Sequence, residues 1–151
     1  MAVLVWLAVF NTIMAKLQAQ QFHNPPELWD PTVASFSHVA IVPAGSRLIF
    51  VAGQGGEEDT KGTLSNDFRT QVQHSLNNIR IALRTQGATM RSIAKVTTLV
   101  VDHNEEKLNI IVEEFAKIWP DKKFPANTLI PVPKLAMPGM QVEIDAIAIG
   151  K

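Results

Sequence analysis

One stretch of this 151-residue chain, from residue 67 to residue 119, constrains the fold more than any other, because two helical stripes flank a run of β-branched residues. Between Asp67 and Gln86, apolar side chains recur at intervals of four, four, three and four residues, which places them along one side of a helix. A second stripe predicts a helix from Asn104 to Trp119. The run from Ile93 to Val101 between the helices predicts a strand.

Local signals predict where the two helices begin. Asn66 or Ser65 can cap the first helix. In the second helix, Asp102 and Glu105 are spaced as in a capping box, in which each side chain bonds to the other residue's backbone. We therefore expect the helices to start at these positions.

Four further strands complete the expected fold. The segment Phe36 to Val42 reads as a first strand, joined as a hairpin to the apolar run Arg47 to Ala52. After the second helix come a proline-entered strand, Phe124 to Ile130, and a long closing strand, Met140 to Ile149. The order β-β-α-β-α-β-β predicts an α+β domain with one mixed sheet and both helices on one face. The three prolines between residues 20 and 31 predict a loop or an extended arm.

The sheet face without helices would be exposed in a single chain. The runs Leu48 to Ala52 and Val96 to Val101 hold more apolar side chains than a sheet with one wet face needs. These runs therefore predict an oligomer that covers this face.

Composition narrows the possible partners. Fourteen basic and fourteen acidic side chains cancel, which argues against a nucleic-acid surface. The chain has no cysteine, and its four histidines form no metal-binding pair motif. We expect no metal and no cofactor.

The N-terminal residues 1–20 form an apolar extension that we separate from a domain at residues 21–151. The run Ala2 to Phe10 is too short to span a bilayer, so no membrane partner is expected. It fits a signal peptide, although no positive charge precedes it and Gln18-Ala19-Gln20 is a poor cleavage site. It also fits an upstream extension before Met14, or an extra element packed on the domain. The expected compartment is the cytoplasm, or the exterior if the segment is a signal peptide.

Glu143 is the most informative side chain of the closing strand. Strand alternation places it on one side together with Gln141 and Asp145, which predicts a solvent-facing acid. However, Ile147 and Ile149 continue the same side, so that side is not plainly solvent. A partly buried carboxylate there can act as a general base toward water.

Two segments near the C-terminus carry a family resemblance. The pattern Phe-Pro-Ala-x-[Ser/Thr] at 124–128, followed by Val-Glu-Ile-[Asp/Glu]-Ala-Ile-Ala at 142–148, resembles the signature of the Rid family (RidA/YjgF), small trimeric imine and enamine deaminases. The resemblance continues upstream through Val51-Ala52-Gly53-Gln54 and through Gln71 to Leu83, and it covers roughly Phe36 to Ile149. It implies a chorismate-mutase-like subunit in a homotrimer, with small-molecule clefts between neighbouring subunits.

The resemblance also implies roles for individual residues. Glu143 matches the acid that positions the attacking water, and Gly53 matches a glycine whose backbone lines the pocket. Asn109 matches an asparagine that faces the cleft. Phe36 stands where a tyrosine is frequent, so an aromatic wall remains but its hydroxyl is lost. Ala52 replaces a frequent serine and Leu129 a frequent cysteine, and both changes make the pocket more apolar.

Asn127 departs from the pattern, because catalytically competent members have an arginine there. In the family, the guanidinium of that arginine binds the carboxylate of an imino or enamino acid through two charge-assisted hydrogen bonds. An asparagine offers only neutral hydrogen bonds. Replacing the arginine therefore costs about 1.5 to 3 kcal/mol of binding free energy for each charge-assisted bond that is lost. Lys134 or Lys123 are the candidates for a substitute charge. Thr128, the Ser/Thr of the motif, completes the expected substrate contacts.

Three functions follow from these residues. The leading hypothesis is an enzyme acting on a neutral or aromatic imine or enamine, with Glu143 orienting water. The alternative is a non-catalytic ligand-binding or chaperone-like homologue. The third is a ribonuclease or translation inhibitor, as some members of this family are described, which the neutral net charge disfavours.

Overall fold

The computed structural model describes residues 20–150, so the expected N-terminal extension lies outside the described residues except for Gln20. The described elements are β1 (Gln21–His23), η1 (Pro31–Ala34), β2 (Val39–Ile41), β3 (Arg47–Gln54), α2 (Phe68–Thr85), η2 (Met90–Ser92), β4 (Ile93–Val101), α3 (Glu105–Ile118), β5 (Ala126–Val132) and β6 (Val142–Gly150). None of the helices within these residues is both long and apolar enough to cross a bilayer.

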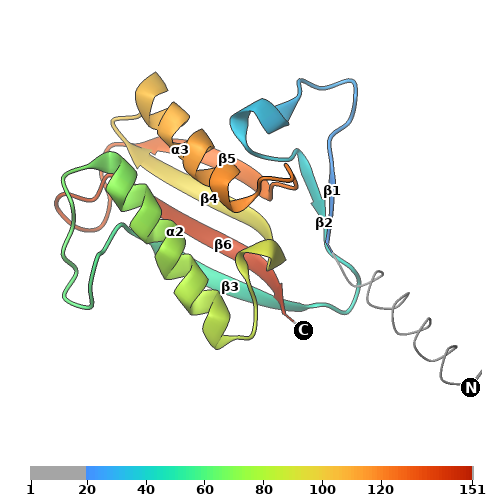
Figure 1. Cartoon of the computed structure of the whole chain (residues 1–151), viewed down its shortest axis with the longest axis horizontal. Helices are drawn as coiled ribbons and strands as arrows, with labels where there is room; N and C mark the ends of the chain where they lie inside the picture. Colours follow the sequence, from blue (N-terminus) through green and yellow to red (C-terminus); the bar gives the residue numbers. More distant parts are fainter. Residues whose placement is uncertain (1–19, 151) are drawn as a thin grey trace, which may run out of the picture.

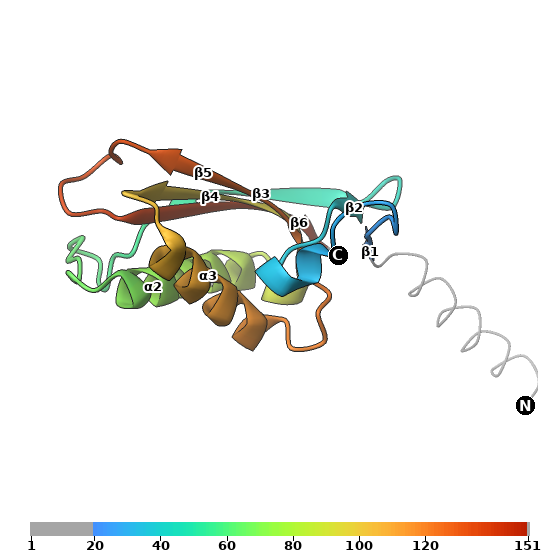
Figure 2. The same cartoon turned by 90° about the horizontal axis from the view of Figure 1, so that it is seen from above.

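The domain is built on a four-stranded sheet in the order β3-β6-β4-β5. β6 runs antiparallel to both β3 and β4, whereas β4 and β5 are parallel, so the sheet is mixed as predicted. The two long helices lie side by side on one face of this sheet (Figures 1 and 2). The predicted α+β architecture with both helices on one face is therefore confirmed.

The first strand pairs differently from the prediction. β2 is antiparallel to β1 and forms with it a separate two-stranded sheet, so the expected hairpin with β3 is wrong (Figure 1). The reason is long-range. Ser37, just before β2, donates its backbone N–H to Pro125 O (3.1 Å) and its hydroxyl to Phe124 O (2.8 Å). These bonds hold this segment at the start of β5, on the opposite edge of the sheet from β3.

Both helices begin one or two residues away from the predicted caps. Asp67 caps α2 by accepting from Thr70 N (2.7 Å), in place of Asn66 or Ser65. Asn104 caps α3 by accepting from Lys107 N (2.8 Å), and the predicted capping box does not form. A capping side chain must lie directly before the first helical turn to reach its free N–H groups, and only Asp67 and Asn104 do.

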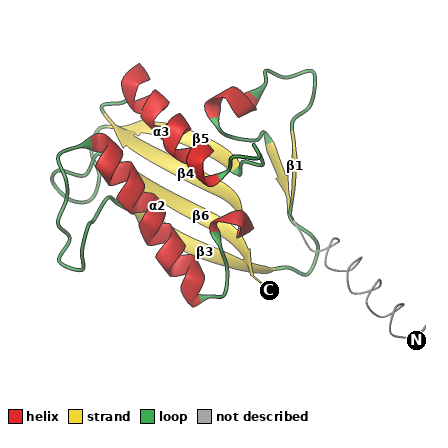
Figure 3. Ribbon diagram, in the orientation of Figure 1, coloured by secondary structure: helices red, strands yellow, loops and turns green. Residues whose placement is uncertain are grey.

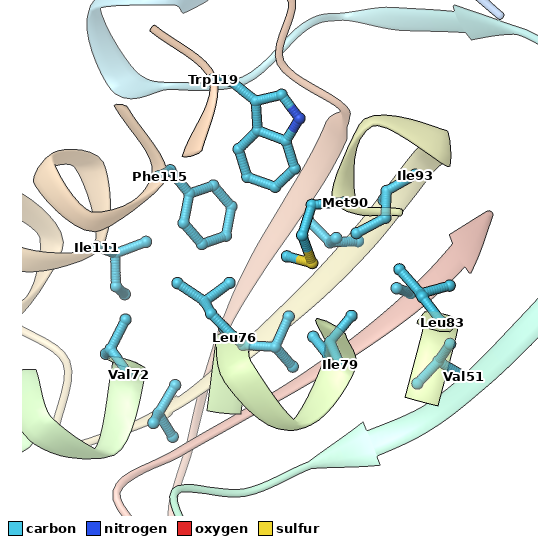
Figure 4. Packing of buried hydrophobic residues seen from close by; sticks show 14 of the residues in the cluster. Val51, Val72, Leu76, Ile79, Leu83, Met90, Ile93, Ile111, Phe115 and Trp119 are labelled. Carbon is cyan, nitrogen blue, oxygen red and sulfur yellow. The ribbon is translucent and has the colours of Figure 1, made fainter. Parts of the chain in front are cut away.

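The core lies between the helices and the sheet. The α2 stripe is buried along its length. Phe115 of α3 and Trp119, which caps the end of α3, are buried with their ring centroids 5.5 Å apart. Figure 4 shows the labelled side chains of both helices pointing toward those of the η2 and sheet segments. This burial stabilises the fold by removing apolar surface from water.

The sheet face without helices is partly apolar and open in the single chain. On β6, alternate residues face the helices and are buried, while Glu143, Asp145 and Ile147 face the other way and are half-buried. On β3, Leu48 is 45% exposed and Phe50 is 72% exposed. Large apolar side chains thus gather on a face that nothing in the described chain covers.

Candidate active site

Glu143 lies directly against Gly53. The pairing of β3 with β6 shifts register between Val51 and Gln54, so one extra residue bulges out of β3 beside Glu143. A Cβ atom built on Gly53 would lie 1.8 Å from Glu143 Oε1. Only glycine therefore leaves room for the carboxylate where it is.

The carboxylate of Glu143 occupies the helix-free face of the sheet. Glu143 is paired with Leu99 of β4, and its side chain is half-buried. Among the hydrogen bonds within residues 20–150, none uses a Glu143 oxygen, whereas Asp145 Oδ1 on the same strand accepts from Thr97 N (3.1 Å). Both Glu143 oxygens are thus available to water or a ligand, whereas one oxygen of Asp145 is already bonded.

Asn127 lies on the opposite face of the sheet. It is paired with Val96, and its Oδ1 accepts from the hydroxyl of Thr98 (3.1 Å), a fully buried residue on the helix-facing side of β4. Leu129 follows on the same side of β5 and packs against the core. With its oxygen engaged by Thr98, the Asn127 amide has its nitrogen left to donate.

Phe36 stands near the same end of β5 as Asn127. The bridge between Ser37 and Ala126 holds its segment there. The Phe36 ring packs against Trp29, with ring centroids 6.3 Å apart, and edge-on against His38 at 5.5 Å. An aromatic wall therefore stands beside the start of β5.

Thr128 and Asn109 lie apart from this group. Thr128 faces the helix-free side, where its hydroxyl accepts from Lys95 Nζ (2.8 Å). Burial lowers the pKa of the Lys95 ammonium below its ordinary value, although the nearby Asp145 carboxylate opposes that shift. Asn109 is exposed on α3.

The two lysines considered as substitutes for the family's arginine lie elsewhere. Lys123 lines a cavity of about 460 Å³ together with Arg91 and Asp121. Lys134 lines a cavity of about 580 Å³ formed by Val101 and residues 133–140. Asn127 lines neither cavity.

The candidate residues form two groups that a single chain does not bring together. Glu143 and Gly53 lie on the helix-free face at the β3–β6 pair. Asn127 and Leu129 lie on the helix side of β5, and the Phe36 segment lies at the start of that strand. Leu99 of β4 pairs with Glu143 of β6 on one side and with Ile130 of β5 on the other, so Glu143 and Ile130 lie at the same height in the sheet. Ile130 is three residues after Asn127 and faces the side of the sheet opposite to Asn127. Within residues 20–150 of one chain, the two groups therefore do not share a site.

Sequence reasoning missed Thr98 and Lys95. Thr98 is the polar member of the inward-facing series Val96, Thr98 and Val100. A hydroxyl at a predicted core position needs a partner, and that signal could have pointed to a neighbour such as Asn127. Lys95 carried no comparable signal, because its contact with Thr128 depends on how β4 and β5 pair.

Comparisons with known proteins agree with this architecture. The family described as Endoribonuclease L-PSP matches residues 29–150. A RutC family protein from Haemophilus influenzae is 30% identical over 115 residues, covering 76% of this chain and 87% of its own. The 2-iminobutanoate/2-iminopropanoate deaminase of Salmonella typhimurium is 28% identical over 113 residues, covering 74% of this chain and 86% of its own.

A solved structure is similar over most of the chain. The Rid protein YyfB from Yersinia pestis, described as of unknown function, superimposes with a TM-score of 0.80 at 30% identity, covering 86% of this chain and 98% of its own. The fold is therefore that of the Rid proteins, and the chain belongs to the Endoribonuclease L-PSP family, the family of RidA and YjgF.

Proposed function

We propose that this protein is a Rid-type enzyme that hydrolyses a neutral or aromatic imine or enamine. The observation that carries the proposal is the Glu143 carboxylate, which lies against the Gly53 bulge and bonds to no other described residue. A relative is named for deamination of 2-iminobutanoate and 2-iminopropanoate, which supports the reaction class.

Glu143 would act as a general base toward water. Its carboxylate accepts a proton as the water oxygen bonds to the imine carbon, and the proton then passes to the nitrogen. In the resulting carbinolamine, the carboxylate takes the remaining hydroxyl proton and delivers it to the nitrogen as the C–N bond breaks, so that ammonia leaves and the carbonyl product remains. The reaction consumes one water and needs no metal or redox partner.

Asn127 would set the preference for neutral substrates. Thr98 engages its oxygen, so the remaining donor is an uncharged N–H suited to a carbonyl or imine acceptor. A carboxylate would lose the charge-assisted bonds that an arginine provides. Phe36 and Leu129 supply apolar walls beside it.

The site would form between copies of the chain. Glu143 and Asn127 lie on opposite faces of one sheet, so a site containing both needs a neighbour. A homotrimer that covers the helix-free face fits this requirement and would also bury Phe50.

The test compares ammonia release from two freshly generated imines, one with a carboxylate and one without. We expect the wild type to hydrolyse the neutral imine and Asn127→Arg to gain activity on the carboxylated one. Glu143→Gln, which keeps the shape of the side chain, should remain folded and lose turnover. If neither wild type nor Asn127→Arg acts on either imine, the deaminase proposal is wrong.

A non-catalytic ligand-binding role is the second candidate, favoured by the loss of the arginine and by the aromatic pair Trp29 and Phe36. It predicts that the wild type binds an aromatic compound but forms no product. Turnover of the neutral imine would exclude it. A ribonuclease role ranks below both because the net charge is zero.

A further inference from the structure

Gln71 is a fully buried amide whose hydrogen-bonding groups are all used. It projects from α2, and its exposed fraction is 0%. Its Nε2 donates to Ser65 O (2.7 Å) and to Gly139 O (2.8 Å). Its Oε1 accepts from Gln141 N (2.8 Å). One side chain therefore joins the loop before α2 to the loop before β6.

The segment after Gly53 is held by the same side of α2. Ser75 donates its hydroxyl to Gln54 O (2.8 Å), and Asn78 donates to Glu57 O (3.0 Å). Gly56 passes so close that a Cβ on it would lie 2.6 Å from the Gln71 backbone. Residues 71, 75 and 78 share one helix face, so α2 presents a row of polar side chains to both loops. The loops before α2 and before β6, drawn green in Figure 3, lie at the end of the sheet where α2 begins.

These contacts act on the two segments that bring Glu143 and Gly53 together. Gln141 is held through both backbone groups, its N–H by Gln71 and its carbonyl by Val101 N (2.9 Å). Glu143 follows two residues later along β6. On the other side, Gln54 directly follows Gly53. A shift of the start of β6 against the end of β3 would therefore move the carboxylate off the bulge.

We infer that Gln71 is a positioning residue that holds the Glu143 carboxylate over Gly53 by tying the start of β6 to α2. Its catalytic consequence rests on the proposed imine hydrolysis. The positional consequence does not, because it concerns only the contact between Glu143 and Gly53. A merely structural glutamine would affect stability and leave that contact unchanged.

The experiment compares Gln71→Met with Glu114→Gln. Methionine has nearly the same length but none of the three hydrogen bonds, whereas Glu114→Gln disturbs a buried polar group that contacts neither loop. For the neutral imine, we expect Gln71→Met to lower kcat about 10- to 100-fold with KM within about twofold. Glu114→Gln should keep kcat within about threefold.

Backbone NMR of the same proteins provides a readout independent of turnover. In Gln71→Met, the amide resonances of Gly53 and Glu143 should shift and the Gln141 amide should exchange faster with solvent, while Glu114→Gln leaves them in place. Unchanged resonances in folded Gln71→Met would overturn the inference, even if the wild type is an active deaminase. Shifted resonances with an inactive wild type would support the inference and reject the proposed function.

A second variant covers the case in which Gln71→Met does not fold. Gln71→Asn keeps the amide but is one methylene shorter, so it cannot span Ser65 O, Gly139 O and Gln141 N together. It should give the same pattern of NMR shifts with a smaller loss of kcat. A Gly53 resonance at the wild-type position in this variant would likewise contradict a positioning role.

Discussion

At the scale of single residues, the position of the Glu143 carboxylate depends on the absence of one atom. Gly53 has no Cβ, and that space holds the end of the Glu143 side chain. The space exists because β3 bulges there. The carboxylate position is thus set by steric fit more than by a hydrogen bond, since no described residue bonds to its oxygens.

Gly53→Ala should therefore displace the carboxylate. The atoms it would meet, Glu143 Oε1, Cδ and Cγ, belong to the flexible end of a side chain. Glu143 can swing aside, so we expect a folded protein whose kcat for imine hydrolysis falls about 10- to 100-fold. Steady-state kinetics and thermal unfolding check both parts.

Ala52→Ser, in the same bulge, is the control and should keep full turnover. Equal kcat values for the Gly53→Ala and Ala52→Ser variants would contradict the steric account.

At the scale of secondary-structure elements, α2 and α3 are joined by a charged network. Arg69 of α2 bonds to Glu114 (2.8 Å) and to Glu113 (2.8 Å) of α3, and Lys117 also bonds to Glu114 (2.7 Å). Glu114 is 5% exposed and Glu113 is largely exposed. Burial by itself would raise the pKa of the Glu114 carboxyl, but hydrogen bonds from Lys117 and Arg69 outweigh burial and hold that pKa below its ordinary value.

Glu114→Gln should lower the free energy of unfolding by about 1 to 2 kcal/mol at neutral pH. The reason is that the buried Glu114 carboxylate, which accepts hydrogen bonds from Arg69 and Lys117, is replaced by an uncharged amide. The folded-state pKa is depressed, so this stabilisation is present above the ordinary pKa of 4.5 and is lost as the pH falls below it. The wild type and the variant should thus converge in acid. Urea unfolding between pH 3 and pH 7 measures this, with the exposed-site variant Glu113→Gln expected within about 0.5 kcal/mol of wild type.

At the scale of the whole molecule, the helix-free face of the sheet exposes large apolar side chains. Phe50 is 72% exposed there, beside Leu48. A self-associating face would cover these side chains and would also bring the Glu143 side of one sheet toward a neighbour. Catalysis and assembly would then depend on the same surface.

Phe50→Glu should prevent this association, because a buried, unpaired carboxylate in an apolar interface is unfavourable. Light scattering after gel filtration should give a trimer for the wild type and a smaller species for the variant. Ile81→Glu changes another exposed apolar residue, on α2 and 45% exposed, and should leave the mass unchanged. A wild-type monomer, or a Phe50→Glu trimer, would contradict assembly through this face.

The sequence alone was sufficient for features that repeat over short distances. The α2 stripe, the β-branched β4 and the alternation of β6 are each contained in a window of some twenty residues or fewer, so local periodicity determines them. The same alternation correctly placed Glu143 on the side opposite Val142 and Ile144. The catalytic role proposed for Glu143 came from the family resemblance and stays a prediction.

Only the tertiary structure decided which distant segments meet. β2 pairs with β1 because Ser37 bonds to Phe124 and Pro125, nearly ninety residues away, and no local pattern encodes that choice. The bulge that seats Glu143 on Gly53 and the bond from Thr98 to Asn127 likewise depend on strand register. Periodicity assigns each side chain to a face of its own element, whereas register and pairing determine which side chains share a site.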